Sequence, residues 1–296
     1  MTLVDSKTRV SLQNLLFASD FSTASDTALS HAMSIARRYD SQIYVAHVIR
    51  ADLFQMVPPE ETSALLENAR RHAEAEMANL LISGRLRGVP HQVLISQGDL
   101  WSVLSEYIQK HQIDLAVVGT HGRTGVRKLL LGSAAEQIFR LAPCPVLTVG
   151  PQAPSSTPPE AEFRRILYAT DFTPHSDRAA AYAVSLAQEH GARLTLLHVV
   201  QDVHDPSARN SATLMNFFQN RLRALLPPTA DLWCEPELVV GFGPAAECIL
   251  RTAEEREEDL VVLGIRRTGN FSGHLPPATA YKVACQAHCP VLTVRG

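Results

Sequence analysis

An internal repeat is the feature that most constrains this chain. Residues 14–48 align without a gap on residues 165–199, with an aspartate, a Ser-Asp pair and a His-Val pair at matching positions. A second block pairs APCPVLTV at residues 142–149 with AHCPVLTV at residues 287–294. Self-similarity of this kind indicates a repeated structural unit. The chain therefore holds two copies of one domain in tandem.

A linker separates the two copies. Residues 151–162 read PQAPSSTPPEAE, and stretches rich in Pro, Ser and charge are typical of linkers. One domain then covers residues 1–150 and the other covers residues 163–296, and the length of 296 residues suffices for two domains. Hydrophobic residues make up 46% of the chain and charged residues 19%, which indicates a globular and not a disordered protein.

Each copy alternates short apolar runs with segments of helical periodicity, which predicts an α/β fold. Strands this apolar are covered on both faces, so we expect Rossmann-like, doubly wound parallel sheets. We expect five strands per sheet in the order 3-2-1-4-5, with the two domains paired about a pseudo-twofold axis. In the first copy the expected strands are residues 12–18, 43–48, 91–95, 115–118 and 146–149, and the expected helices are residues 24–39, 100–110 and 133–141, with one more within 60–86.

A glycine-rich loop follows the fourth expected strand. The sequence reads GTHG, nine further residues and then GS, over residues 119–133. Gly119 and Gly122 would let the backbone approach a ligand closely. Gly132 and Ser133 open a helix whose N–H groups suit an anion, so the loop favours a polyphosphate. Three cations lie in the loop: Arg123, Arg127 and Lys128. In the expected strand order this loop faces Asp20, which ends the first strand, across the crevice where such folds bind ligands.

The spacing G-x2-G-x9-G-S, within GTHGRTGVRKLLLGSAAEQIFRLAPCPVLTV, resembles the universal stress protein family, as does the opening LLFASDFSTASDTAL. The resemblance covers almost all of both halves. It implies a Rossmann-like fold, paired domains and an ATP-binding subgroup defined by this loop. By position it implies that Asp20 meets the ribose side and that the backbone of Val48 meets the adenine edge. It further implies that the phosphate end is lined by Gly119, Gly122, Gly132, Ser133 and Ala134.

Several of these residues also have a purely structural interpretation. Ser133 with Glu136 reads as a capping box, and Asp20 could simply hold the turn after its strand, since Asp171 repeats it. Arg123 and its neighbouring cations could be ordinary surface charges. His47 and His198 are interpreted as histidines satisfied within the fold, and not as ligands.

The second copy keeps only part of the loop. GIRR at residues 264–267 replaces GTHG, and Pro277-Ala278 stands where Gly132-Ser133 stands in the first copy. A side chain at Arg267 crowds the approach, and Pro277 removes an N–H donor. We therefore expect ATP in the first domain only, accompanied by Mg²⁺ as bound triphosphates favour.

Charge and cysteine content narrow the function further. The net charge of −3 gives no reason to bind nucleic acid or an anionic membrane, no apolar run spans a bilayer, and the first ten residues lack a signal core, so we expect a cytoplasmic protein. Five cysteines do not make a disulfide framework, and the corner formed by Cys285, His288 and Cys289 lacks a fourth metal ligand.

No paired acid and base converges on the loop, which favours an ATP-binding regulatory module with an unidentified protein partner over an enzyme. The alternatives are a slow ATP-hydrolysing or adenylyl-transfer enzyme and a nucleotide-free dimeric scaffold. Association of the domain pair into a higher homo-oligomer stays open.

Overall fold

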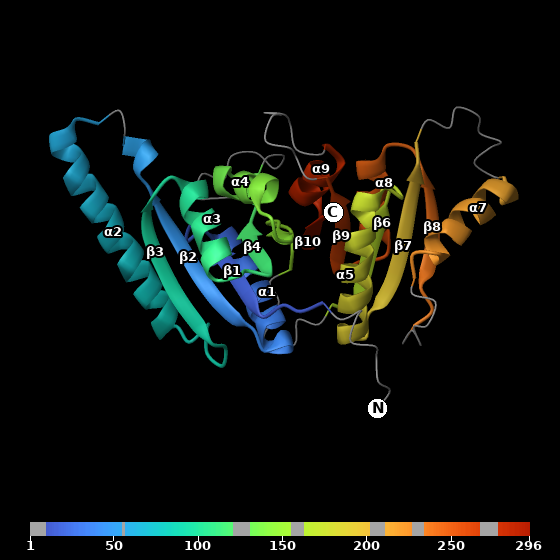
Figure 1. Ribbon diagram of the computed structural model, residues 1–296, viewed down its shortest axis with the longest axis horizontal. Coiled ribbons are helices and arrows are strands. Elements are labelled where there is room, and N and C mark those ends of the chain that lie inside the picture. The colour runs from blue at the N-terminus through green and yellow to red at the C-terminus, as the bar shows by residue number, and fades with distance from the viewer. Residues whose placement is uncertain are drawn as a thin grey trace. The chain divides into compact units, whose positions relative to one another are not determined.

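The computed structural model describes residues 10–54, 57–120, 131–154, 163–201, 211–226, 234–266 and 278–296. These residues form two compact units, one built on Ser11–Pro151 and one built on Glu162–Gly296. We call them the N-terminal unit and the C-terminal unit, and Figure 1 labels their helices and strands.

The N-terminal unit is a parallel sheet with helices on both faces. Its strands pair in the order β3-β2-β1-β4-β5, every pair parallel. Along the chain the elements are β1 (Asn14–Ala18), α1 (Thr23–Tyr39), β2 (Gln42–Arg50), the 3-10 turn η1 (Ala51–Phe54), α2 (Pro59–Ile82), β3 (His91–Gly98), α3 (Leu100–Lys110), β4 (Leu115–Gly119), α4 (Ser133–Leu141) and β5 (Val146–Val149).

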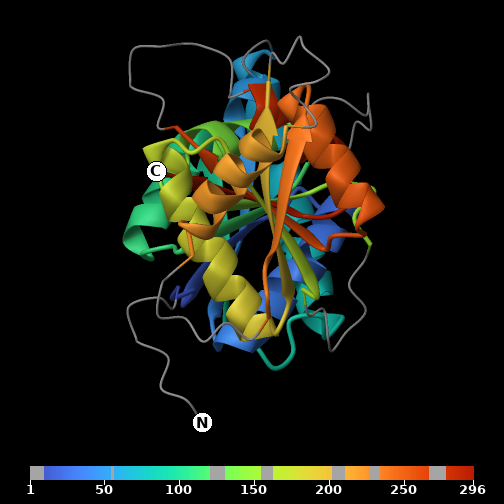
Figure 2. The same ribbon diagram turned by 90° about the vertical axis from the view of Figure 1, so that its right-hand side faces the viewer.

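The C-terminal unit repeats this arrangement. Its strands pair in parallel in the order β8-β7-β6-β9-β10. Figure 2, which looks at this unit, shows α5 and α8 on opposite faces of its sheet. Along the chain the described elements are β6 (Arg165–Thr170), α5 (Pro174–His190), β7 (Arg193–Val200), α7 (Ala212–Arg223), β8 (Glu237–Phe242), α8 (Ala245–Glu255), β9 (Leu260–Ile265), α9 (Ala278–Gln286) and β10 (Val291–Arg295). The predicted α/β class with parallel sheets is confirmed in both halves.

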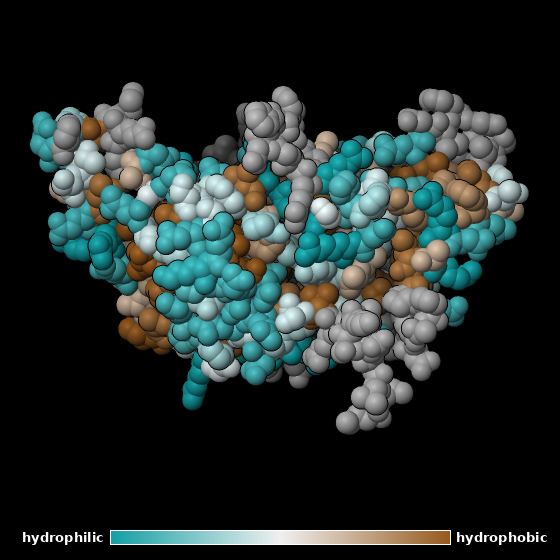
Figure 3. Space-filling view, viewed as in Figure 1, coloured by the Kyte–Doolittle hydropathy of each residue, from teal (hydrophilic) through white to brown (hydrophobic). Residues whose placement is uncertain are grey.

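Apolar strands and small helix residues make the core. Leu15 and Leu16 of β1 are fully buried, which is why this strand reads as a continuous apolar run and not as an alternating one. Ala28 and Ala32 of α1 are also fully buried, and their small side chains let the helix lie close to the sheet. Figure 3 shows hydrophilic residues over much of the visible face, with hydrophobic ones between them.

None of the helices in the described part of the chain combines the length and the apolarity that a membrane crossing requires.

Four cysteines are buried and Cys234 is half-buried, all as free thiols. Burial raises the pKa of Cys289 to about 12, so this thiol stays protonated. Within the described residues no group of three or more His, Cys, Asp or Glu side chains could hold a metal ion. The described residues include Cys285, His288 and Cys289.

Candidate functional site

The carboxyl ends of β1, β2 and β4 meet at one edge of the N-terminal sheet. Ala18 pairs with Ala46 of β2 on one side and with Val118 of β4 on the other. Asp20, which follows β1, and Gly119, which ends β4, therefore lie at the same edge of the sheet. This edge is where doubly wound folds bind ligands.

Asp20 holds the turn from β1 into α1. Its Oδ1 accepts hydrogen bonds from the Ser25 hydroxyl at 2.6 Å and the Ser22 backbone N–H at 3.1 Å. Phe21, which lies between Asp20 and Ser22 in the chain, adopts the left-handed conformation with φ of 60°. Burial of the carboxylate opposes ionisation, but the bonds from Ser22 and Ser25 outweigh it and lower the pKa of Asp20. The group is therefore an anion at neutral pH.

The C-terminal unit repeats this turn. Oδ1 of Asp171 accepts from the Thr173 hydroxyl at 2.7 Å and from the Ser176 hydroxyl at 2.7 Å. Phe172 takes the left-handed conformation with φ of 58°. The structural role that the sequence suggested for this aspartate is therefore present in both units.

His47 and His198 are satisfied within the fold, as interpreted from the sequence. The Nδ1 atom of His47 lies 2.8 Å from the carbonyl oxygen of Ser19, and that of His198 lies 2.9 Å from the carbonyl oxygen of Thr170. Each ring also packs on the phenylalanine of its turn, with ring centroids 4.5 Å apart in the first unit and 4.4 Å in the second. These histidines brace the turns that carry the aspartates.

Val48 presents its backbone to the crevice. The carbonyl of Ala46 accepts from the N–H of Ser19 just beyond β1. Because backbone groups alternate sides along a strand, the N–H and carbonyl of Val48, two residues later, face the same side. β1 has already ended at Ala18 there, so these two groups look into the crevice. Such a donor and acceptor pair can read the edge of a planar heterocycle.

Gly132, and not Ser133, caps helix α4. The sequence predicted a capping box from Ser133 to Glu136, and the structure corrects it: α4 begins at Ser133, Gly132 is the N-cap, and no side chain bonds to the cap N–H groups. The reason is tertiary, because the N–H of Gly132 donates to the carbonyl of Thr120 at 2.7 Å and so fixes where the helix starts. The first turn of α4, including Ala134, thus keeps donors for an anion.

Arg50 is a site residue that the sequence reasoning missed. It ends β2, and its guanidinium donates to the Ser133 hydroxyl at 2.9 Å and forms a two-pronged ion pair with Asp52, the closer contact being 2.6 Å. The hydrogen bond to Asp52 raises the pKa of Arg50. Side chains two apart in a strand share a face, so Arg50 lies on the same face of β2 as Val48, but the strand expected from the sequence stopped at residue 48.

Gly119 has a packing role in this structure. A Cβ at this position would stand 2.8 Å from the backbone carbonyl of Ala24 in α1. A Cβ at Gly264 would likewise stand 2.6 Å from the Cα of Ser176 in α5. Glycine is needed at both positions so that the helix can approach the strand end, which explains why the second copy keeps this glycine.

The remaining predicted residues, Gly122 and Arg123, lie outside the described residues, together with His121, Arg127 and Lys128. The structure therefore places Asp20, Val48 and Gly119 at the carboxyl edge of one sheet, and Gly132, Ser133 and Ala134 at the start of the helix that follows β4.

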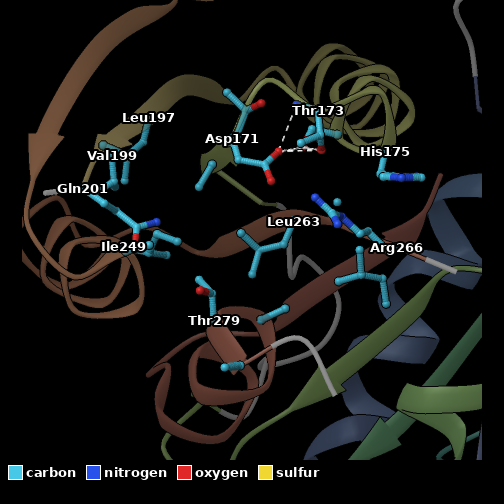
Figure 4. A pocket seen from close by; sticks show the side chains of 18 residues that line it. Asp171, Thr173, His175, Leu197, Val199, Gln201, Ile249, Leu263, Arg266 and Thr279 are labelled. Carbon is cyan, nitrogen blue, oxygen red and sulfur yellow. Dashed lines mark hydrogen bonds between the residues drawn. The ribbon is translucent and has the colours of Figure 1, made fainter. Parts of the chain in front are cut away.

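The equivalent edge of the C-terminal unit holds a pocket of about 410 Å³, shown in Figure 4. It lies between the carboxyl ends of β6, β7 and β9 and the start of α9. Five of its lining residues occupy the repeat positions of predicted site residues. Asp171 matches Asp20, Val199 matches Val48, Gly264 matches Gly119, Ala278 matches Ser133 and Thr279 matches Ala134.

Comparison with protein families shows that a family model matches this chain in two places. The model described as the Universal stress protein family matches residues 11–150 and again residues 162–295. Both described units are thus accounted for by the same family domain.

Individual proteins agree with this match. A universal stress protein from Methanocaldococcus jannaschii is 30% identical over 138 residues, covering 46% of this chain and 81% of its own. One from Mycolicibacterium smegmatis is 27% identical over 292 residues, covering 95% of this chain and 96% of its own. The solved structure of a universal stress protein from Archaeoglobus fulgidus matches with a TM-score of 0.67 at 20% identity, covering 95% of this chain and 98% of its own. At 20% identity, this structural similarity supports the fold alone.

Proposed function

The chain belongs to the universal stress protein family, as two tandem family domains, and on that premise we propose that it is a regulatory module that binds ATP in its first domain. The domains of this proposal are residues 1–150 and 163–296, joined by residues 151–162. The observation that carries the proposal is the start of α4, where the first helical turn has no side-chain cap and the Ser133 hydroxyl lies beside the cation of Arg50.

The phosphate end of the nucleotide would lie against this helix start. Backbone N–H groups of the first turn of α4 and the positive end of its dipole attract an anion. The Ser133 hydroxyl and the Arg50 guanidinium, 2.9 Å apart, can both contact the same phosphate oxygen. Gly122 and Arg123 are proposed to complete the phosphate contacts, and Mg²⁺ would accompany the triphosphate.

The nucleoside end would lie across β1 and β2. Oδ2 of the ionised Asp20 can accept hydrogen bonds from ribose hydroxyls, as acidic residues do in related nucleotide-binding sheets. The backbone N–H and carbonyl of Val48 would pair with the adenine edge. The two ends together span the crevice from β2 to α4.

A binding role fits the described residues better than catalysis. His47, the described histidine next to Asp20, is occupied by the Ser19 carbonyl and the Phe21 ring, so it is a poor general base. We therefore expect any ATP hydrolysis to be far slower than the ~10 s⁻¹ median of enzymes.

Mass spectrometry of the small molecule released from purified protein, followed by calorimetric titration with ATP, tests the proposal. Gly132→Val should abolish ATP binding by placing a branched side chain at the anion site. It should leave the fold intact, because Gly132 has ordinary extended backbone with φ of −60°. Ala278→Val, at the repeat position of Ser133, is the matched control and should leave ATP binding in the first domain unchanged. Absence of ATP binding by the unaltered protein would refute the proposal.

A further inference from the structure

The pocket of the C-terminal unit carries an inference of its own. Its volume of about 410 Å³ lies in the range of small-molecule sites. Its walls are mainly apolar, from Leu197, Ile249 and Leu263, with a few polar side chains at the rim. In Figure 4 Asp171, Gln201 and Thr279 surround the same space. An apolar pocket with a few convergent polar groups is the usual form of a ligand site.

Comparison of the two copies shows which ligand contacts the second copy has lost. At the phosphate end, Ala278 replaces Ser133 and removes the hydroxyl, and Gln201 replaces Arg50 and removes the cation. The sequence also has Pro277 in place of Gly132. Each change removes a donor or a charge that a polyphosphate needs.

The groups that would hold a nucleoside are all kept. Asp171 repeats the hydrogen bonds of Asp20, and its pKa is lowered by bonds from Thr173 and Ser176 that outweigh the effect of burial. In Figure 4 these bonds engage one carboxylate oxygen, and the other points toward the pocket. A purely apolar ligand is disfavoured, because it would bury the ionised carboxylate of Asp171 without offering it hydrogen-bond donors.

The backbone of Val199 completes this half of the site. The N–H of Gly243 donates to the carbonyl of Val200, so the backbone groups of Val200 face β8. By alternation along the strand, those of Val199 face the β6 side, where β6 has ended at Thr170. Val199 thus offers a donor and an acceptor to the pocket between apolar walls. That combination suits the edge of a purine.

We propose that the second domain binds a purine nucleoside or its monophosphate, and discriminates against the triphosphate. The ribose hydroxyls bond to Asp171 and the base lies between Ile249 and Leu263, with its edge on Val199. Arg266, which is exposed and lines the pocket, can neutralise a single phosphate. The inference takes the orientation of the nucleoside from the proposed function, but it does not require the first domain to be occupied.

Calorimetric titration of the full-length Gly132→Val variant with adenosine, AMP and ATP tests this proposal, because that change removes the first site. We expect adenosine or AMP to bind once per chain and ATP to bind at least tenfold more weakly. Stronger binding of AMP than of adenosine would show that Arg266 takes a phosphate, and equal binding would show that the nucleoside alone is recognised.

Two further substitutions, each in the Gly132→Val background, locate the site. Asp171→Asn keeps an Oδ1 acceptor for the turn but removes the charge, and should weaken nucleoside binding about tenfold or more. Asp177→Asn, on the exposed side of α5, is the matched control and should change nothing. Thr279→Phe fills the pocket and should abolish binding, with circular dichroism confirming that the variant is folded.

The possible failures are distinguishable. If the unaltered protein binds ATP but the Gly132→Val variant binds no nucleoside, the inference fails and the proposed function stands. If nucleoside binding survives both Asp171→Asn and Thr279→Phe, the ligand lies elsewhere and the inference is wrong. Tight ATP binding by the Gly132→Val variant that Thr279→Phe abolishes would also overturn it. If nucleoside binding depends on Asp171 while the unaltered protein binds no ATP, the inference stands and the proposed function fails.

Discussion

Arg50 and its repeat counterpart Gln201 differ by a full charge at the same place in two copies of one fold. Arg50 is held by Asp52 and touches Ser133, so its charge is already aimed at the start of α4. A bound phosphate would share or replace the Asp52 carboxylate as the partner of this guanidinium. We therefore expect the two copies to differ in the charge of the ligand that they accept.

Arg50→Gln, which copies the residue of the second domain, should weaken ATP binding about tenfold, because a charge-assisted hydrogen bond is lost. Titration calorimetry at low and high salt measures the effect, and the variant should also show a weaker salt dependence. Arg70→Gln, which breaks an exposed ion pair on α2, is the control and should leave affinity unchanged. Equal affinities for Arg50→Gln and the unaltered protein would mean that this cation does not contact the phosphates.

Glu258 is a second residue with a measurable consequence. Its side chain is buried, with 3% of its surface exposed. Burial raises its pKa to about 7 despite a hydrogen bond from Thr195 and the attraction of Arg256 and Arg165, and repulsion from Asp259 adds to the rise. The folded protein keeps this proton up to about pH 7, whereas an unfolded glutamate loses it near its ordinary pKa of 4.5. The stabilising contribution of Glu258 is therefore fully present below the pKa of the unfolded chain, and it is lost as pH rises through the pKa of the folded protein.

Glu258→Gln should flatten this dependence, because the amide stays neutral at every pH. Between pH 5 and pH 8 the unaltered second domain should lose at most about 3 kcal/mol of unfolding free energy through this group. Hydrogen exchange of a peptide covering β9 reports on this domain alone, which suits a chain of two domains. Glu257→Gln, at an exposed neighbour, should keep the slope. If unfolding free energy still falls with pH in the Glu258→Gln variant, groups other than Glu258 cause the pH dependence.

At the scale of elements, apolar runs locate the strands well but do not locate their ends. The second strand was expected to stop at residue 48, yet β2 continues to Arg50, and β3 continues to Gly98. These two residues are paired with each other across the sheet. Strand length is thus set by a partner distant in sequence, which local composition does not encode. The sequence proposed Ser133 through the loop spacing, Asp20 through the expected strand order, and Val48 only through the family resemblance. The contact of Arg50 with Ser133 depended on this pairing.

The glycine at the end of β4 gives a prediction at this scale. Gly119→Ala places a Cβ 2.8 Å from the Ala24 carbonyl, so α1 must move, at a cost of about 1–3 kcal/mol in unfolding free energy. Gly264→Ala should act in the same way against Ser176. Gly241→Ala in β8 is the matched control, because its Cβ would meet only ordinary contacts at 3.5 Å or more. Urea denaturation compares the three variants, and equal midpoints would show that this close approach is not needed.

At the scale of the whole molecule, the two copies keep one fold while their ligand-facing residues diverge. The turn aspartates, the bracing histidines and the glycines at the strand ends are shared. The hydroxyl and the cation at the phosphate end belong to the first copy alone. On the two proposals made above, a shared scaffold with one altered end of the site would give two domains of different ligand specificity.

The stoichiometry of ATP tests this asymmetry. We expect one tightly bound ATP per chain, because the second site lacks the Ser133 hydroxyl and the Arg50 charge, and at about 1.5–3 kcal/mol each these losses weaken binding by two orders of magnitude or more. Restoring the second site should require Gln201→Arg, Arg267→Gly, Pro277→Gly and Ala278→Ser together, since each change alone leaves another obstruction. Calorimetry should then rise from one site to two. Two equivalent ATP sites in the unaltered chain would show that the second domain tolerates these losses, and with that result the argument from the altered loop would fall.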